Sequence, residues 1–137
     1  MLFRSHRFTY ALLPHHGDLR QAGVIQEGYA LNQPIRLQSL APHPVGEGEP
    51  SRQSWLSIDG EGIVLEAMKV AEEGEGIVLR LYEAFGSRCD CRLNIRLPFR
   101  RVDRVDLLER TQEQLACEAQ TVELHLKPFE IVTLKLV

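Results

Sequence analysis

The stretch GIVLEAMKVAEEGEGIVLRLYEAFG, residues 62–86, decides the fold. Apolar and polar residues alternate on both sides of a short turn, AEEGEG, and this arrangement is typical of a β-hairpin whose turn contains glycine. Side chains of a strand point alternately to its two faces. In the second half the alternation places Ile77, Leu79 and Leu81 on one face and Val78, Arg80 and Tyr82 on the other. In the first half it places Ile63, Leu65 and Ala67 on one face and Val64, Met68 and Val70 on the other.

Similar alternation recurs along most of the chain. The further strands that we expect are 7–13, 54–59, 89–97, 102–110, 120–127 and 129–137. Pro98 and Pro128 separate neighbouring strands, since proline cannot donate a ladder hydrogen bond. About eight short strands with frequent turns predict a mostly β protein, an antiparallel β-sandwich or barrel, and we favour the sandwich.

One helical segment is expected near the N-terminus. Asp18 is a suitable N-cap, and Gln21 three positions later completes a capping box. Gly23 and Gly28 weaken this helix by about 1 kcal/mol each relative to alanine, and Pro34 closes it. The proline- and glycine-rich stretch 38–53 is predicted to be a long surface loop.

The composition limits the class of protein. A chain of 137 residues with a net charge of −3 predicts one domain over 1–137 and no nucleic-acid partner, because binding phosphates needs a basic face. We expect no membrane span, because no apolar run approaches about 18 residues. Cys89, Cys91 and Cys117 are interpreted as free thiols, and together with the missing signal peptide they predict a cytoplasmic location. The opening residues enter a strand at once, which we interpret as a domain cut from a longer polypeptide.

Few residues form a recognisable reactive group. His15, His16 and Asp18 offer metal-binding side chains, but a catalytic zinc needs three protein ligands and Asp18 is already explained as a helix cap. We therefore predict neither a metal site nor catalytic residues in the chain. Glu66 and Glu83 stand inside apolar strand patterns and are expected to be buried or paired at a sheet edge.

Three aromatic residues are candidates for contact with a sugar. Trp55, Tyr82 and Phe85 could each stack on the apolar face of a pyranose ring, although core packing is the more common use of such side chains. A carbohydrate-binding sandwich that acts on its own would present these aromatics on one exposed face.

Several phrases of the sequence, in this order, resemble the C-terminal region of glycoside hydrolase family 38 α-mannosidases, above all the bacterial and cytosolic types. The phrases are HRFTYALLPHHGDL at 6–19, AGVIQEGYALNQP at 22–34, SWLSIDGEGIVLEAMKVAEEGEGIVLRLYEAFG at 54–86 and PFEIVTLKLV at 128–137. The family's zinc motif also contains His-x-Asp. However, that motif lies near the start of the catalytic domain, whereas His16-Gly17-Asp18 corresponds to a phrase of the C-terminal region.

The resemblance implies a role for the chain. It suggests a non-catalytic C-terminal β-sandwich domain of an α-mannosidase, which packs against the catalytic domain of its own parent and borders the substrate cleft. Zinc and the nucleophile are then expected in that catalytic domain. Arg80, or the turn from Phe85 to Arg88, is the candidate for reaching an α-mannoside. A domain without its parent should expose an apolar patch, through which self-association is expected. The alternative is an autonomous carbohydrate-binding module.

Overall fold

The computed structural model describes residues 7–39 and 53–137, which belong to two separate compact units, Met1–Val45 and Gly46–Val137. The surface loop predicted over 38–53 falls almost entirely outside the described residues. Among the residues that are described, no helix is both long and apolar enough to cross a membrane.

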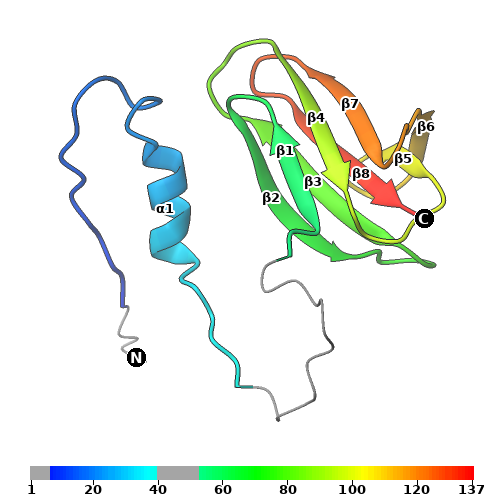
Figure 1. Cartoon of the computed structure of the whole chain (residues 1–137), viewed down its shortest axis with the longest axis horizontal. Helices are drawn as coiled ribbons and strands as arrows, with labels where there is room; N and C mark the ends of the chain where they lie inside the picture. Colours follow the sequence, from blue (N-terminus) through cyan, green and yellow to red (C-terminus); the bar gives the residue numbers. More distant parts are fainter. Residues whose placement is uncertain (1–6, 40–52) are drawn as a thin grey trace, which may run out of the picture. The chain divides into compact units, whose positions relative to one another are not determined.

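The described part of the first unit, residues 7–39, contains one helix, α1, Val24–Asn32 (Figure 1). The capping box at Asp18 is present. Its Oδ1 accepts hydrogen bonds from the backbone N–H groups of Arg20 and Gln21, both at 2.9 Å, and its own N–H donates to Gln21 Oε1 at 3.3 Å. It caps only a single turn, however. Gly23 has a φ of 62°, and the N–H groups of Gly23 and Val24 donate to the carbonyls of Arg20 and Leu19. This is the Schellman pattern that ends a helix, so α1 has to start anew at Val24.

The prediction of a strand at 7–13 is wrong. Residues 7–13 form neither helix nor strand, and Phe8, Tyr10 and Leu12 are exposed. A strand is defined by the partner with which it pairs, and no described residue pairs with this segment. The sequence of 7–13 therefore alternates like a strand, but no described strand pairs with it.

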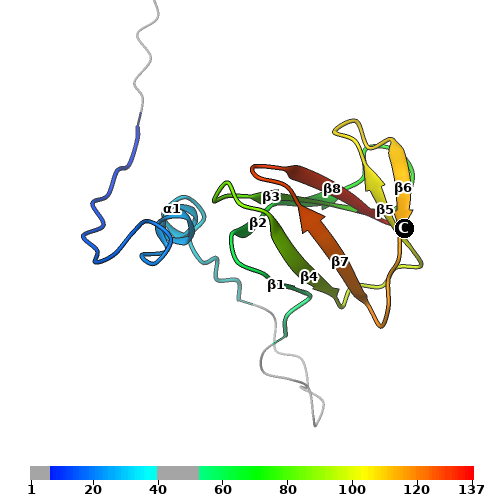
Figure 2. The same ribbon diagram turned by 90° about the horizontal axis from the view of Figure 1, so that it is seen from above.

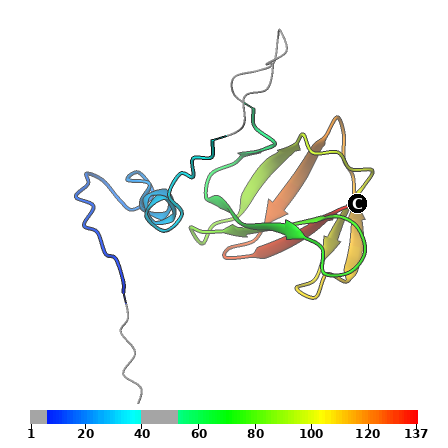
Figure 3. The same cartoon turned by 90° about the horizontal axis from the view of Figure 1, so that it is seen from below.

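The second unit is an antiparallel β-sandwich, as the sequence predicts. Its strands are β1 (Leu56–Asp59), β2 (Ile63–Val70), β3 (Ile77–Glu83), β4 (Cys89–Ile95), β5 (Val102–Val105), β6 (Thr111–Leu115), β7 (Thr121–Leu126) and β8 (Ile131–Leu136). One sheet has the order β1-β4-β7 and the other β2-β3-β8-β5-β6. Figures 2 and 3 show the three-stranded sheet lying across one face of the five-stranded sheet, with β5 and β6 beyond it.

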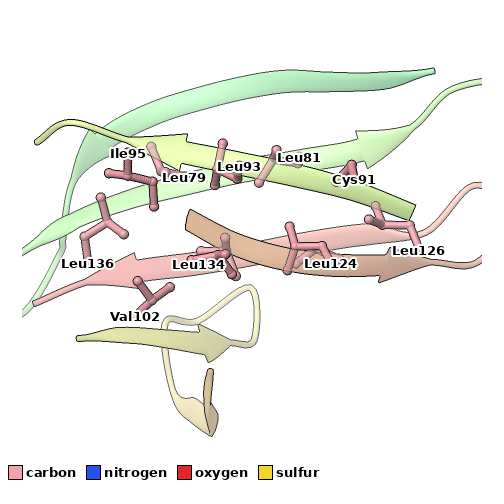
Figure 4. Close-up of a cluster of buried hydrophobic side chains, with 12 residues drawn as sticks. Leu79, Leu81, Cys91, Leu93, Ile95, Val102, Leu124, Leu126, Leu134 and Leu136 are labelled. Atoms are coloured by element: carbon pink, nitrogen blue, oxygen red, sulfur yellow. The ribbon is translucent and has the colours of Figure 1, made fainter. Parts of the chain in front are cut away.

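The core lies between the two sheets. Leu79 and Leu81 of β3 pack with Leu93 of β4 and Leu134 of β8, and all four are fully buried (Figure 4). Val78, Arg80 and Tyr82 alternate with these leucines, so they point to the outer face of the five-stranded sheet. The sandwich core thus determines which side chains of β3 are available outside.

Two details of the strands differ from the prediction. Residues 102–110 are not one strand but β5 followed by a turn, and β6 was missed because its sequence, TQEQL, carries no apolar alternation. In β2 the register shifts between Leu65 and Ala67, so that Met68 faces Leu79 and Ala67 faces Arg80. The extra residue of this β-bulge moves all later side chains to the opposite face, which reverses the predicted faces beyond Leu65.

Replacing the central core residue tests the sandwich. We expect Leu79→Ala to lower the free energy of unfolding by about 3 kcal/mol, because it leaves a cavity between the sheets. Met68→Ala, on the exposed part of β2, should change it by less than about 1 kcal/mol. Urea denaturation of both variants provides the measurement. Equal losses would contradict the position of the core.

Candidate functional site

A buried carboxylate ties two turns together at one end of the sandwich. Glu83 ends β3, and its side chain is only 1% exposed. Its Oε1 accepts a hydrogen bond from the backbone N–H of Phe85 at 2.8 Å. Its Oε2 accepts from the N–H groups of Gly86 at 2.7 Å and Phe129 at 2.9 Å. The Ser87 hydroxyl lies 3.3 Å from Oε1. The turn after β3 and the turn before β8 are therefore joined through one side chain.

These hydrogen bonds keep Glu83 charged. Burial by itself raises the pKa of the carboxyl, but the donors, those of Phe129 and Phe85 first, outweigh burial and lower the pKa to about 2. Phe129 itself has a φ of 58°. Its ring covers Gly86 so closely that a Cβ there would lie 2.6 Å from the ring's Cζ. Since both oxygens already bind the protein itself, we interpret Glu83 as a structural carboxylate.

The outer face of the five-stranded sheet is centred on Arg80 of β3. Arg80 has Ala67 of β2 and Thr133 of β8 as its cross-strand neighbours on this face, and its Nε donates to the Thr133 hydroxyl at 3.3 Å. In the next row Lys69 and Lys135 flank Val78 from the two neighbouring strands. Arg80 and the two lysines form the floor of a hollow of about 1050 Å³.

The turn between β5 and β6 forms one wall of this hollow. The carboxylate of Asp106 accepts hydrogen bonds from the N–H groups of Leu108 and Arg110, both at 2.9 Å, which closes the turn. Glu109, with a φ of 63°, then reaches across to the turn after β2. Its carboxylate lies 2.5 Å from Lys69 Nζ and accepts from the backbone N–H of Glu72 at 2.8 Å. The wall is therefore attached both to the sheet and to the opposite turn.

Charges of both signs line the hollow. Lys69 Nζ donates hydrogen bonds to the carboxylates of Glu109 and Glu72, and these bonds raise the pKa of Lys69. The same contact with Lys69 lowers the pKa of Glu109. Lys135 Nζ donates to the carbonyl of Glu73 at 3.0 Å. Lys69 donates to carboxylates, whereas the guanidinium of Arg80 donates to the neutral hydroxyl of Thr133. A guanidinium has five N–H donors, so in that position it can also donate to the hydroxyls of a sugar or to a carboxylate.

Exposed apolar side chains border the hollow. Leu107 and Leu108 line it, and Leu107 also lines an adjoining hollow of about 270 Å³ together with Ile131. All three are more than half exposed. Large apolar side chains grouped on one face of a domain are typical of a surface that contacts another protein.

The structure does not bring the three aromatic candidates onto one face. Trp55 precedes β1 of the three-stranded sheet and is half exposed, whereas Tyr82 lies on the outer face of the five-stranded sheet beside Ile131. Phe85 belongs to the turn after β3 and packs against Gly62, where a Cβ would lie 2.7 Å from its ring. A role for Trp55, Tyr82, Phe85 or Arg80 in substrate binding stays a prediction.

The His-x-Asp phrase lies in the first unit. His15, His16 and Asp18 are all exposed, and the carboxylate of Asp18 is occupied by the turn that it caps. Gln21 closes over Gly17 so tightly that a Cβ at Gly17 would clash with its Oε1. Within 7–39 and 53–137, no group of three or more His, Cys, Asp or Glu side chains is arranged to hold a metal ion.

The sequence analysis did not predict one pair of polar residues. On the outer face of the three-stranded sheet, His125 of β7 faces Asp90 of β4, with 2.6 Å between Nδ1 and Oδ1, and Asp90 raises the pKa of the imidazole. Both line a hollow of about 350 Å³ with Asp59 and Arg92. The two residues are 35 positions apart, so only the pairing of β4 with β7 could have revealed the contact. Both side chains are largely exposed, and we interpret the pair as a surface ion pair.

Comparison with known proteins identifies the sandwich. Residues 62–134 match the family model of the glycosyl hydrolases family 38 C-terminal beta sandwich domain. Human Alpha-mannosidase 2C1 is 41% identical over 96% of the chain, and Alpha-mannosidase G of Dictyostelium discoideum is 30% identical over 97%. A putative mannosylglycerate hydrolase of Halalkalibacterium halodurans is 28% identical over 97%. The chain spans only 12–14% of the length of these relatives.

The Glu83 contacts lead to a prediction about stability. Glu83→Gln should lower the free energy of unfolding at neutral pH by about 3 kcal/mol, because it removes the charge that several buried N–H groups bind. Glu123→Gln, which alters an exposed ion pair with Arg92, should change it by less than about 1 kcal/mol. Chemical denaturation of both variants measures the difference. Similar losses in the two variants would contradict the structural role of Glu83.

The same substitution has a pH signature. The pKa of Glu83 is lowered from 4.5 to about 2 on folding, so its contribution is fully present above pH 4.5 and is lost as the pH falls towards 2. The difference in stability between the native chain and Glu83→Gln should therefore shrink across this range. A difference that stays constant from about pH 7 to about pH 2.5 would show that the charge of Glu83 does not carry the effect.

Proposed function

The chain belongs to glycosyl hydrolase family 38, whose C-terminal β-sandwich domain it carries, and from this we propose that it is the non-catalytic C-terminal part of a longer α-mannosidase. In this proposal the parent hydrolyses terminal α-mannosides with residues that lie outside this chain. The relatives support the substrate class, since two of the three bear the name Alpha-mannosidase. The role of the sandwich is then to pack against the catalytic domain and to border its substrate cleft.

One observation supports the choice of the face that packs against the catalytic domain. The outer face of the five-stranded sheet combines the exposed Leu107, Leu108 and Ile131 with the guanidinium of Arg80. Burying three such side chains against a second domain contributes roughly 1.5–3 kcal/mol each. An arginine beside that contact would donate hydrogen bonds to sugar hydroxyls at the edge of the cleft. Charged side chains line the hollow on the three-stranded sheet as well, but the apolar residues of its lining, Cys91 and Leu124, are buried, so it suits such packing less well.

The remaining parts of the proposal concern the parent. The zinc that the family resemblance implies belongs to its catalytic domain, because His15, His16 and Asp18 do not form a set that fits a metal. A cytoplasmic location is supported by the three cysteines, which are all free in the structure. Cys91 is buried, and burial raises the pKa of its thiol to about 11, so it behaves as a packing residue.

The contact surface is tested in a hybrid enzyme in which this chain replaces the matching 13% of human Alpha-mannosidase 2C1. Leu107→Asp should leave the unfolding of the isolated chain unchanged but lower the stability of the hybrid by about 2 kcal/mol or more, because the leucine is covered only in the hybrid. Val70→Asp, which changes a comparably exposed apolar residue at the edge strand β2, is the matched control. Equal effects of the two substitutions in thermal unfolding of the hybrid would refute this choice of surface.

The role of Arg80 is tested by kinetics in the same hybrid. Arg80→Ala should lower kcat/KM for a chromogenic α-mannoside by about tenfold, the effect of losing one or two hydrogen bonds to the substrate. Arg92→Ala, on the opposite sheet, should leave kcat/KM unchanged. If both variants keep full activity while the hybrid requires the sandwich, the domain supports the enzyme without touching substrate. Binding of mannose by the isolated chain would instead favour the autonomous carbohydrate-binding module.

A further inference from the structure

Residues 7–39 leave most of their large apolar side chains in contact with solvent. Phe8 is 82% exposed, Tyr10 80% and Leu12 90%, and Leu19, Ile35 and Leu37 are also exposed. No residue of α1 is buried. Disordered segments are poor in apolar residues and rich in charge, whereas this segment is rich in large apolar residues. Its composition is that of a segment that becomes covered.

Within 8–13, the spacing of Phe8 and Tyr10 fits an extended backbone. Phe8 and Tyr10 stack with ring centroids 6.3 Å apart, which places these two side chains on the same side of the backbone. A spacing of two residues in an extended chain brings side chains to about this separation. Thr9 and Ala11 alternate with them and are smaller. The run from Phe8 to Leu13 contains no charged residue, and Pro14 ends it where a ladder could not continue.

The comparisons separate this segment from the sandwich. The family model of the C-terminal sandwich covers 62–134 and leaves 7–39 out. The matches to the relatives cover 96–97% of the chain, so they necessarily take in most of 7–39. In the relatives the corresponding segment therefore belongs to a much longer polypeptide, of which this chain spans 13% in the human protein.

We propose that residues 8–13 form a β-strand that adds to the edge of a sheet in the remaining part of the parent hydrolase. Phe8, Tyr10 and Leu12 would be buried on the apolar face of that sheet, and the backbone groups of 8–13 would complete its ladder. This inference rests on the proposed function, because it takes the parent polypeptide as the occupant of the surface. It adds a second attachment, separate from the outer face of the sandwich.

Hydrogen exchange measured by mass spectrometry tests the strand directly. In the isolated chain the amides of 8–13 should exchange close to the rate of an unfolded peptide. In the hybrid with human Alpha-mannosidase 2C1 they should exchange about 100-fold more slowly, because they enter a sheet. Tyr10→Asp should abolish this protection in the hybrid. Thr9→Asp, on the opposite side of the same segment, should retain most of it.

The outcomes distinguish this inference from the proposed function. A hybrid that hydrolyses an α-mannoside while 8–13 exchange freely overturns the strand and leaves the proposed function standing. Protection of 8–13 in a hybrid without activity supports the strand and counts against the function. If the hybrid does not fold, the isolated chain is mixed with Alpha-mannosidase 2C1 lacking its matching 13%, and the absence of protection in that mixture overturns the inference. Protection that appears in the isolated chain alone, as its concentration rises, assigns the strand to a second copy and also overturns it.

Discussion

The arrangement of the sandwich depends on the buried carboxylate of Glu83. Its hydrogen bonds join the end of β3 to a turn 46 residues further along the chain, and they do so on the strand that also supplies Leu79, Leu81 and Arg80. A buried charge is costly unless it is fully bound, and here the donors are backbone N–H groups whose positions the turns fix. The carboxylate therefore helps to align β3 with β8, and this alignment places Thr133 beside Arg80.

The strands with regular alternation could be predicted, because alternation is imposed by a core on one side. Residues 77–82 behave as expected for this reason. β6 could not be predicted, since TQEQL is held by backbone pairing with β5 at a solvent-exposed edge. The segment 7–13 gave the opposite error, because it alternates like a strand although the described residues offer it no sheet.

Only part of the candidate site could be predicted from the sequence. Arg80 could be named from the family resemblance and from its outward position on an alternating strand. Its surroundings, however, come from the turn between β5 and β6, which the sequence pattern merges into a single strand. Glu109 attaches that turn to the turn after β2 through a left-handed backbone conformation at a residue other than glycine. The pair of His125 and Asp90 depends equally on strand pairing, since neither neighbours the other in sequence.

The bulge in β2 has a consequence for comparing members of the family. Because Glu66 is the extra residue, a strand that lacked it would still direct Leu65 inward, Ala67 outward and Met68 inward. A homologue with a regular strand would thus be one residue shorter at this point. An alignment without a gap at position 66 would pair each later inward position of that homologue with an outward position of this chain, and variation there would be attributed to the wrong face of the sheet.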